Sequence, residues 1–280
     1  MGGVVIHAPA LAAALATDTG RVRTLNEDSA LAAGTIFVVA DGMGGHAAGE
    51  VASRIAADAV ARLDGRPGLR VEHLVAQVEE ANREIVAEAG RHPDRRGMGT
   101  TVAGVAVVDV AGAAHWAVFN VGDSRVYHLR PDSSLVQVSV DHSEVQELVD
   151  AGVITAEQAR RHPARHVVTR SLGHDPLGGV DTWVVPQEAG DRFLVCSDGL
   201  TNEVEDAEIR GVLLAVPDVG AAARELVQRA RDRGGRDNIT VIVVAFGRVP
   251  SGGADHDRDD GEEETVPRDR PVEGDGQVTW

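Results

Sequence analysis

The segment 101 TVAGVAVVDVAGAAHWAVFNVGDSRVYHLRPDSSLVQVS 139 carries four apolar, β-branched stretches that are separated by short turns. Such runs, bounded by Gly, Asp, Asn and Pro, predict strands at 101–109, 114–121, 124–130 and 134–139. Connections of a few residues cannot carry a crossover, so we expect these consecutive strands to pair antiparallel. This part of the chain therefore predicts antiparallel β-structure and argues against steady β-α-β alternation.

The same signals mark further elements on both sides of this segment. Apolar residues that recur every three or four positions predict helices at 47–64 and 71–89, which we expect to pair antiparallel over one face of a sheet. The other predicted strands lie near 10–17 and at 35–41, 181–186, 191–198 and 238–246, and the other predicted helices at 143–151, 155–161, 206–215 and 219–233. Helices in pairs and strands in runs indicate an α+β fold, with helices outside two packed antiparallel sheets.

The charge and cysteine content limit the expected partners and location. The chain has 280 residues, 27 Lys+Arg against 44 Asp+Glu, and a formal net charge of −17. Phosphates repel such a surface, so neither nucleic acid nor an anionic membrane is an expected partner. No stretch has the character of a membrane span, the N-terminus lacks the basic start of a secretory signal, and the single Cys196 cannot form an internal disulfide. We therefore expect a cytoplasmic monomer.

The composition also divides the chain. Residues 251–280 contain ten acidic residues against three Arg and few aliphatic side chains, which predicts a disordered acidic tail at 249–280. A single domain is expected at 10–248, after a flexible N-terminus at 1–9.

Four aspartates lie where predicted strands begin or end. Asp41 ends TIFVVAD, Asp198 ends RFLVCSD, Asp123 lies in a turn between two strands, and Asp237 precedes NITVIVV. One Asp at such a place is most often only a turn former. If the strands are neighbours, however, four carboxylates would converge and repel one another unless cations lie between them.

The donor set indicates which cations these would be. The sequence shows no His or Cys grouping with zinc spacing, whereas carboxylate and carbonyl oxygens suit Mg²⁺ or Mn²⁺. A pair of such ions can activate water and hold a phosphoryl group. Hydrolysis of a phosphate ester is the reaction that this arrangement serves best.

Seven sequence blocks occur in a fixed order along the chain. They are TDTGRVRTLNEDS (17–29), VVADGMGGHAAGEVAS (38–53), GTT (99–101), NVGDSRVY (120–127), DHS (141–143), VCSDGL (195–200) and RDNITVIVV (236–244). Together they resemble the bacterial branch of the protein phosphatase 2C (PP2C, PPM) family of metal-dependent serine/threonine phosphatases. The resemblance covers about residues 12–247 and implies two packed antiparallel sheets flanked by helix pairs. It also implies Mn²⁺ or Mg²⁺, as two ions with a third in some bacterial members, and a metal-bridged water that would hydrolyse phosphoserine or phosphothreonine in the substrates of Ser/Thr kinases.

The resemblance assigns metal ligands at matching positions. It implies that Asp41 bridges two ions and that the carbonyl of Gly42 binds the second. Asp198 and Asp237 would complete the shell of the first ion. Glu27 would hold the second ion directly or through water.

The resemblance also assigns residues that face the substrate. Arg23 would bind the substrate phosphate, Asp123 would share a third ion with Asp198, and residues 141–176 would form a flap that selects substrates. Some eukaryotic members have a His directly after Asp-Gly as a proposed general acid, but Met43 stands there in this chain. We therefore expect the proton to come from a water on the third ion, and we treat His46 as a loop histidine.

A second interpretation remains open from the sequence. The chain could be a catalytically weak family member that binds phosphoproteins as a regulator. Such members usually lack some of the acidic ligands, whereas this chain has every expected one.

Overall fold

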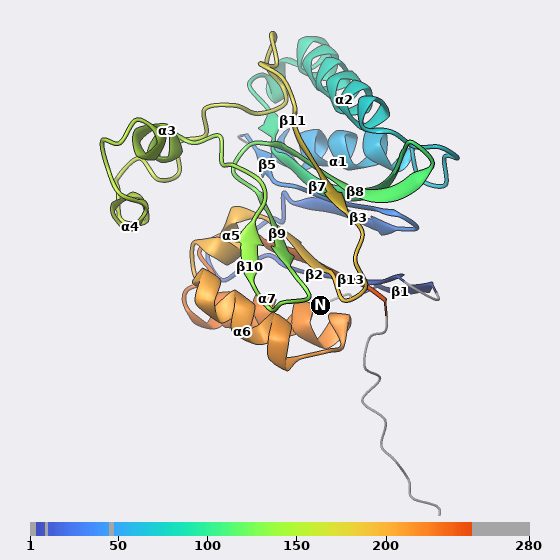
Figure 1. The fold of residues 1–280 in the computed structure, drawn as a ribbon. Helices are drawn as coiled ribbons and strands as arrows, with labels where there is room; N and C mark the ends of the chain where they lie inside the picture. The colour runs from blue at the N-terminus through green and yellow to red at the C-terminus, as the bar shows by residue number, and fades with distance from the viewer. Residues whose placement is uncertain (1–3, 9–10, 45–47, 248–280) are drawn as a thin grey trace, which may run out of the picture.

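Two antiparallel sheets stack face to face between two pairs of helices (Figure 1). The computed structural model describes residues 4–8, 11–44 and 48–247. The six-stranded sheet has the order β1 (Val4–Ala8), β2 (Leu11–Asp18), β13 (Ile239–Phe246), β12 (Arg192–Cys196), β9 (Arg125–Leu129) and β10 (Leu135–Gln137). The five-stranded sheet has the order β11 (Asp181–Pro186), β8 (Ala113–Val121), β7 (Val102–Val110), β4 (Ile36–Ala40) and β3 (Ser29–Ala33). The predicted α+β fold with two packed antiparallel sheets is confirmed.

Each sheet is covered on its outer face by one helix pair. Helices α1 (Ala48–Ala61) and α2 (Val71–Arg91) pack on the five-stranded sheet, and α6 (Asp206–Ala215) and α7 (Val219–Asp232) pack on the six-stranded sheet. The buried face of α1 consists largely of alanines, which let the helix lie close to the strands. Between the sheets, Phe37, Trp116 and Phe193 are fully buried and form the centre of a third apolar cluster. The two sheets are therefore held together by a core of buried apolar side chains.

The prediction that four consecutive strands pair in sequence is only partly right. The hairpins β7–β8 and β9–β10 pair as expected, but β8 and β9 belong to different sheets. Gly122, with φ of 111°, turns the chain from one sheet into the other. A short connection between two strands can be a corner of a sandwich as well as a hairpin, and the sequence does not distinguish them.

Several short elements were not predicted. The sequence analysis missed β3, the two-stranded ladder of β5 (Gly42–Met43) and β6 (Gly99–Thr100), the short helix α5 (Asp198–Thr201) and a 3₁₀ turn at Pro93–Arg95. Val4–Ala8 form β1, paired with β2, within the segment 1–9 for which a flexible start was expected. The β-branched residues of this strand favour extended structure. The predicted acidic tail lies outside the described residues.

The segment expected to form a flap stands away from the sandwich. It contains α3 (Glu144–Asp150) and α4 (Ala156–Ala159), which project beside the two sheets in Figure 1. Isolated bridges join Ser143 to Val168 and Thr100 to Leu172, so both ends of the segment are held near the sheets. Within the described ranges, no helix combines the length and the apolar character needed to cross a membrane.

Candidate metal centre

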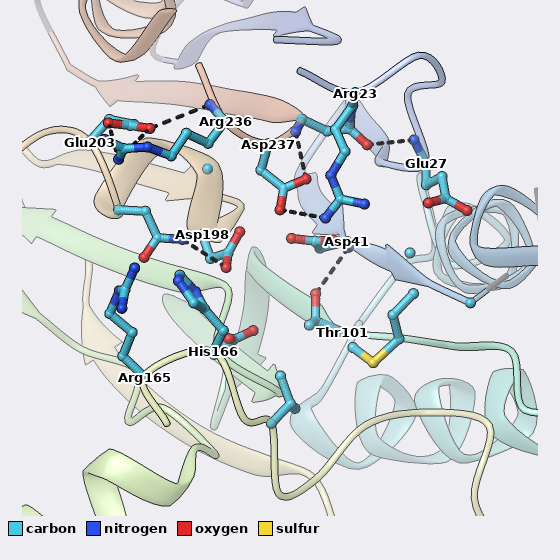
Figure 2. Close-up of a pocket in the computed structure, with 18 residues that line it drawn as sticks. Arg23, Glu27, Asp41, Thr101, Arg165, His166, Asp198, Glu203, Arg236 and Asp237 are labelled. Atoms are coloured by element: carbon cyan, nitrogen blue, oxygen red, sulfur yellow. Dashed lines mark hydrogen bonds and ion pairs between the residues drawn. The ribbon is translucent and has the colours of Figure 1, made fainter. Parts of the chain in front are cut away.

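A cavity of about 510 Å³ opens at the edge where strands of both sheets begin or end (Figure 2). Asp41 follows β4 of the five-stranded sheet, whereas Asp198 begins α5 after β12, and Asp237 precedes β13. Asp123 lies in the turn between β8 and β9, where the chain passes from one sheet to the other. All four aspartates predicted from the sequence therefore line one cavity.

These carboxylates lie close enough to disturb one another. Burial raises the pKa of Asp41, Asp123 and Asp198 above the ordinary aspartate value, and neighbouring negative charges raise it further. For Asp41 these charges belong to Asp28, Asp198, Asp123 and Asp237. The site therefore concentrates negative charge that a cation would neutralise.

The backbone around Asp41 is held firmly. Its N–H donates to Thr101 Oγ1 at 3.0 Å, and its carbonyl accepts from the Thr101 N–H and from Thr100 Oγ1, both at 2.9 Å. Thr100 at the end of β6 and Thr101 just before β7 thus fix the residue that the resemblance places between two ions.

Glycines bring Glu27 against the backbone beside Asp41. A Cβ on Gly42 would lie 2.4 Å from the carbonyl oxygen of Glu27, and a Cβ on Gly49 would lie 2.7 Å from Glu27 Oε1. Glu27 Oε1 is buried and has no hydrogen-bond partner among the described residues. A buried carboxylate oxygen without a donor is costly, and a bound cation would satisfy it.

Asn238 fixes the loop that carries the two predicted residues Arg23 and Glu27. Its Oδ1 accepts from the Glu27 N–H at 2.8 Å, and its Nδ2 donates to the carbonyls of Thr19 and Leu25 at 3.0 and 2.8 Å. Asn238 thus orients this loop through three hydrogen bonds.

Arg23 forms an ion pair with Asp237, one of the proposed metal ligands. Its Nη2 donates to Asp237 Oδ2 at 2.8 Å, and this bond is the main cause that raises the pKa of the guanidinium. Without cations, Arg23 therefore balances part of the charge of the cavity. A cation on Asp237 would leave the guanidinium free to bind an anion.

Asp28 belongs to the same charge cluster and was missed by the sequence analysis. Burial raises its pKa to about 7, with further contributions from Asp198 and Asp237. Ser197 Oγ donates to Asp28 Oδ2 at 2.9 Å, whereas Oδ1 has no partner in the described part of the chain. The tandem acids of NED, Glu27 and Asp28, were the available signal.

Residues of the flap also reach the cavity. Arg165 and His166 line it opposite Arg23 (Figure 2). His166 is exposed although it borders the cavity. Met43 lines the cavity after Gly42, and His46 lies outside the described residues.

The donor chemistry fits hard divalent cations, although the cavity is not a finished coordination cage. Among residues 4–8, 11–44 and 48–247, no three His, Cys, Asp or Glu side chains are arranged as a ready-made metal site. The fit rests on clustered carboxylates with raised pKa, on the unpartnered Glu27 Oε1 and on a set of oxygen donors. Cations entering the cavity would offset the mutual repulsion of these carboxylates.

The fold and this cavity define a class of protein, and comparison with known proteins agrees. The chain belongs to the protein phosphatase 2C family, whose model matches residues 21–240.

Individual relatives cover most of the chain. The serine/threonine protein phosphatase PstP of Mycobacterium tuberculosis is 42% identical over 233 residues, which are 81% of this chain and 43% of PstP. This chain therefore spans less than half of that relative. The serine/threonine phosphatase stp of Listeria innocua is 39% identical over 243 residues, which are 81% of this chain and 93% of stp.

Solved structures support the same relationship. The crystal structure of PstP from M. tuberculosis matches with a TM-score of 0.77 and 41% identity, over 85% of this chain and 100% of that one. A structure of the PstP catalytic domain in complex with two manganese ions matches with a TM-score of 0.76 and 40% identity, over 85% of this chain and 99% of that one.

Proposed function

We propose that this protein hydrolyses phosphoserine and phosphothreonine in protein substrates, with Mn²⁺ or Mg²⁺ as cofactor, and so opposes Ser/Thr kinases. The observation that carries the proposal is the convergence of Asp41, Asp123, Asp198 and Asp237, from both sheets, on one cavity. Family membership and the manganese-bound relative support the same chemistry.

Each residue has a physical role in this proposal. Asp41, Asp198 and Asp237 would hold the cations, together with Glu27 and the carbonyl of Gly42. When bound, the cations would supply Lewis-acid activation of water at neutral pH and neutralise phosphate charge.

The remaining groups bind and orient the substrate. Arg23, released from Asp237, can bind phosphate oxygens through a planar fork of donors, which suits an anion with several acceptors. Asp123 extends the cluster beside Asp198 and would hold a third cation near the leaving group. Arg165 places a positive charge of the flap at the cavity, beside His166.

The setting expected for this activity follows from the same features. We propose a diffusible phosphoprotein as substrate, selected by the flap, and a cytoplasmic location. Cys196 is buried and free, so the described fold uses no disulfide.

Release of phosphate from a phosphothreonine peptide tests the proposal. The purified protein should release phosphate with Mn²⁺ and stop when EDTA is added. Asp237→Asn should be inactive, whereas Asp232→Asn, an exposed carboxylate on α7, should keep wild-type turnover. A wild-type protein that binds the phosphopeptide with saturating Mn²⁺ but releases no phosphate would instead support the second interpretation, in which the chain is a regulator that binds phosphoproteins.

A further inference from the structure

The two proposed ligands of the first cation come from different segments. Asp198 begins α5, whereas Asp237 follows the loop Gly234–Arg236 and precedes β13. Their charges repel, since both carboxylates line the same cavity. Before a cation binds, a contact between the two segments is therefore needed to keep these carboxylates close together.

An ion pair crosses between these segments just beside the two ligands. Glu203 lies two residues after α5, and Arg236 is the residue directly before Asp237. The Arg236 Nη1 donates to both carboxylate oxygens of Glu203, at 3.1 and 3.2 Å, and its backbone N–H points to Oε1 at 3.4 Å (Figure 2). The carboxylate thus holds both the side chain and the backbone of Arg236.

This pair is more than a surface contact. The side chain of Glu203 is only 4% exposed, although that of Arg236 is 70% exposed. The carboxylate also packs on Gly234, where a Cβ would lie 2.9 Å from Glu203 Oε1. A buried carboxylate with one cationic partner becomes an uncompensated charge when that partner is removed.

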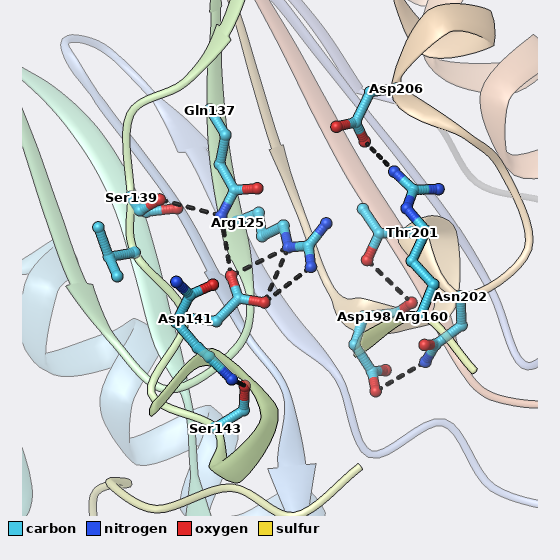
Figure 3. A network of polar contacts seen from close by, with 12 residues as sticks. Arg125, Gln137, Ser139, Asp141, Ser143, Arg160, Asp198, Thr201, Asn202 and Asp206 are labelled. Atoms are coloured by element: carbon cyan, nitrogen blue, oxygen red, sulfur yellow. Dashed lines mark hydrogen bonds and ion pairs between the residues drawn. The ribbon is translucent and has the colours of Figure 1, made fainter. Parts of the chain in front are cut away.

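The α5 side of the contact is itself fixed. Asn202 Nδ2 donates to Asp198 Oδ2 at 2.9 Å, and Thr201 Oγ1 donates to the Asp198 carbonyl at 3.3 Å (Figure 3). The Glu203 N–H donates to the carbonyl of Leu200 at 3.1 Å. Glu203 is therefore connected to Asp198 through one short helical turn, so a shift of Glu203 would also move Asp198.

From these contacts we infer that Glu203 and Arg236 form a clasp that sets the spacing of Asp198 and Asp237 for cation binding. Both are positioning residues and neither is a ligand. The inference rests on the proposed function, because it assumes that these two aspartates share a cation.

Binding of Mn²⁺ to the purified full-length protein, measured by titration calorimetry and by the rise in Tm, tests the clasp separately from activity. Glu203→Gln and Arg236→Met should each weaken Mn²⁺ binding by about tenfold, as is typical of residues that orient ligands. Because they act as one unit, the double variant should bind no more weakly than the weaker single variant. The KM for the phosphothreonine peptide at saturating Mn²⁺ should stay at the wild-type value.

A second Arg–Glu ion pair, which is more exposed, provides the control. Arg62, directly after α1, and Glu84 on α2 are joined by two hydrogen bonds of 2.6 and 3.1 Å, on the outer face of the five-stranded sheet. Arg62→Met and Glu84→Gln should leave Mn²⁺ binding unchanged.

The outcomes separate the clasp from the proposed function. If the wild-type protein binds no Mn²⁺, the proposed function itself fails. If the wild type binds Mn²⁺ and both clasp variants bind it equally well, the clasp is wrong. A raised KM in Arg236→Met with unchanged Mn²⁺ affinity would make Arg236 a substrate contact instead.

Discussion

Replacing Asp28 by asparagine should stabilise the metal-free protein at alkaline pH. An unfolded aspartate loses its proton near pH 3.8, whereas Asp28 in the folded protein has a pKa of about 7. Between these values the unfolded chain releases a proton that the folded chain keeps. The free energy of unfolding therefore falls as the pH rises from about 4 to about 7, and this contribution is constant above that.

The size of the effect follows from the same two values. Each pKa unit corresponds to about 1.36 kcal/mol, so the ionised Asp28 costs the folded state about 4 kcal/mol at pH 8.5. An uncharged asparagine side chain would remove this cost and can still accept the hydrogen bond from Ser197. At pH 5.5 the gain should be about half as large, because only half of the pH interval has been crossed.

Urea unfolding in EDTA at the two pH values measures the difference. Asp58, an exposed residue of α1, provides the control: Asp58→Asn should change the free energy of unfolding little at either pH. Added Mn²⁺ should reduce the difference in the free energy of unfolding between Asp28→Asn and wild type, because bound cations offset the repulsion between the carboxylates. Equal stability of Asp28→Asn and wild type in EDTA at pH 8.5 would refute the reasoning.

Four further predictions concern catalysis and the C-terminal segment. Asp41→Asn and Asp198→Asn should abolish turnover yet leave the metal-free protein at least as stable, because each removes a repelling charge; wild-type kcat in either variant excludes that residue as a ligand. Arg23→Ala should mainly raise KM, as expected for a phosphate contact made already in the ground state, and an unchanged KM would move this role elsewhere. Asp123→Ala should lower kcat on a phosphothreonine peptide far more than on p-nitrophenyl phosphate, whose leaving group needs little protonation; equal losses would contradict this. Deleting 251–280 should leave Tm within a degree or two, because the segment has few apolar residues to pack, and a drop of several degrees would show that it docks.

The sequence predicted the architecture because its strong strands are long and apolar. The pattern of segments such as 35–41 and 238–246 clearly predicts strands, and both segments are buried along almost their whole length. By contrast, β3 has the sequence SALAA, which lacks β-branched residues, and all five of its residues are only partly buried. Its pairing with β4 decides its structure, and no local signal does.

The candidate site was predictable where the ligands adjoin strands. Asp41 and Asp237 could be found because the sheet carries them to its edge. Asp28, whose only sequence signal is its place beside Glu27 in NED, and Glu203 were missed, because their importance comes from contacts with segments far away in sequence, Ser197 and Arg236. The position of the flap residue His166 at the cavity could likewise not be predicted, since it depends on how the flap folds.

The origin of the site residues links cation binding to the whole fold. Asp41 comes from the five-stranded sheet, Asp198 and Asp237 come from the six-stranded sheet, and the apolar core around Phe37 and Phe193 packs these sheets together. Cations bound among these carboxylates would therefore join the two sheets and would be lost when the sheets separate. A ligand that binds only the folded state at a hundred times its Kd adds about 2.7 kcal/mol to stability. Stabilisation by Mn²⁺ should accordingly appear in the global unfolding transition and protect amides of both sheets from exchange, because the centre belongs to neither sheet alone.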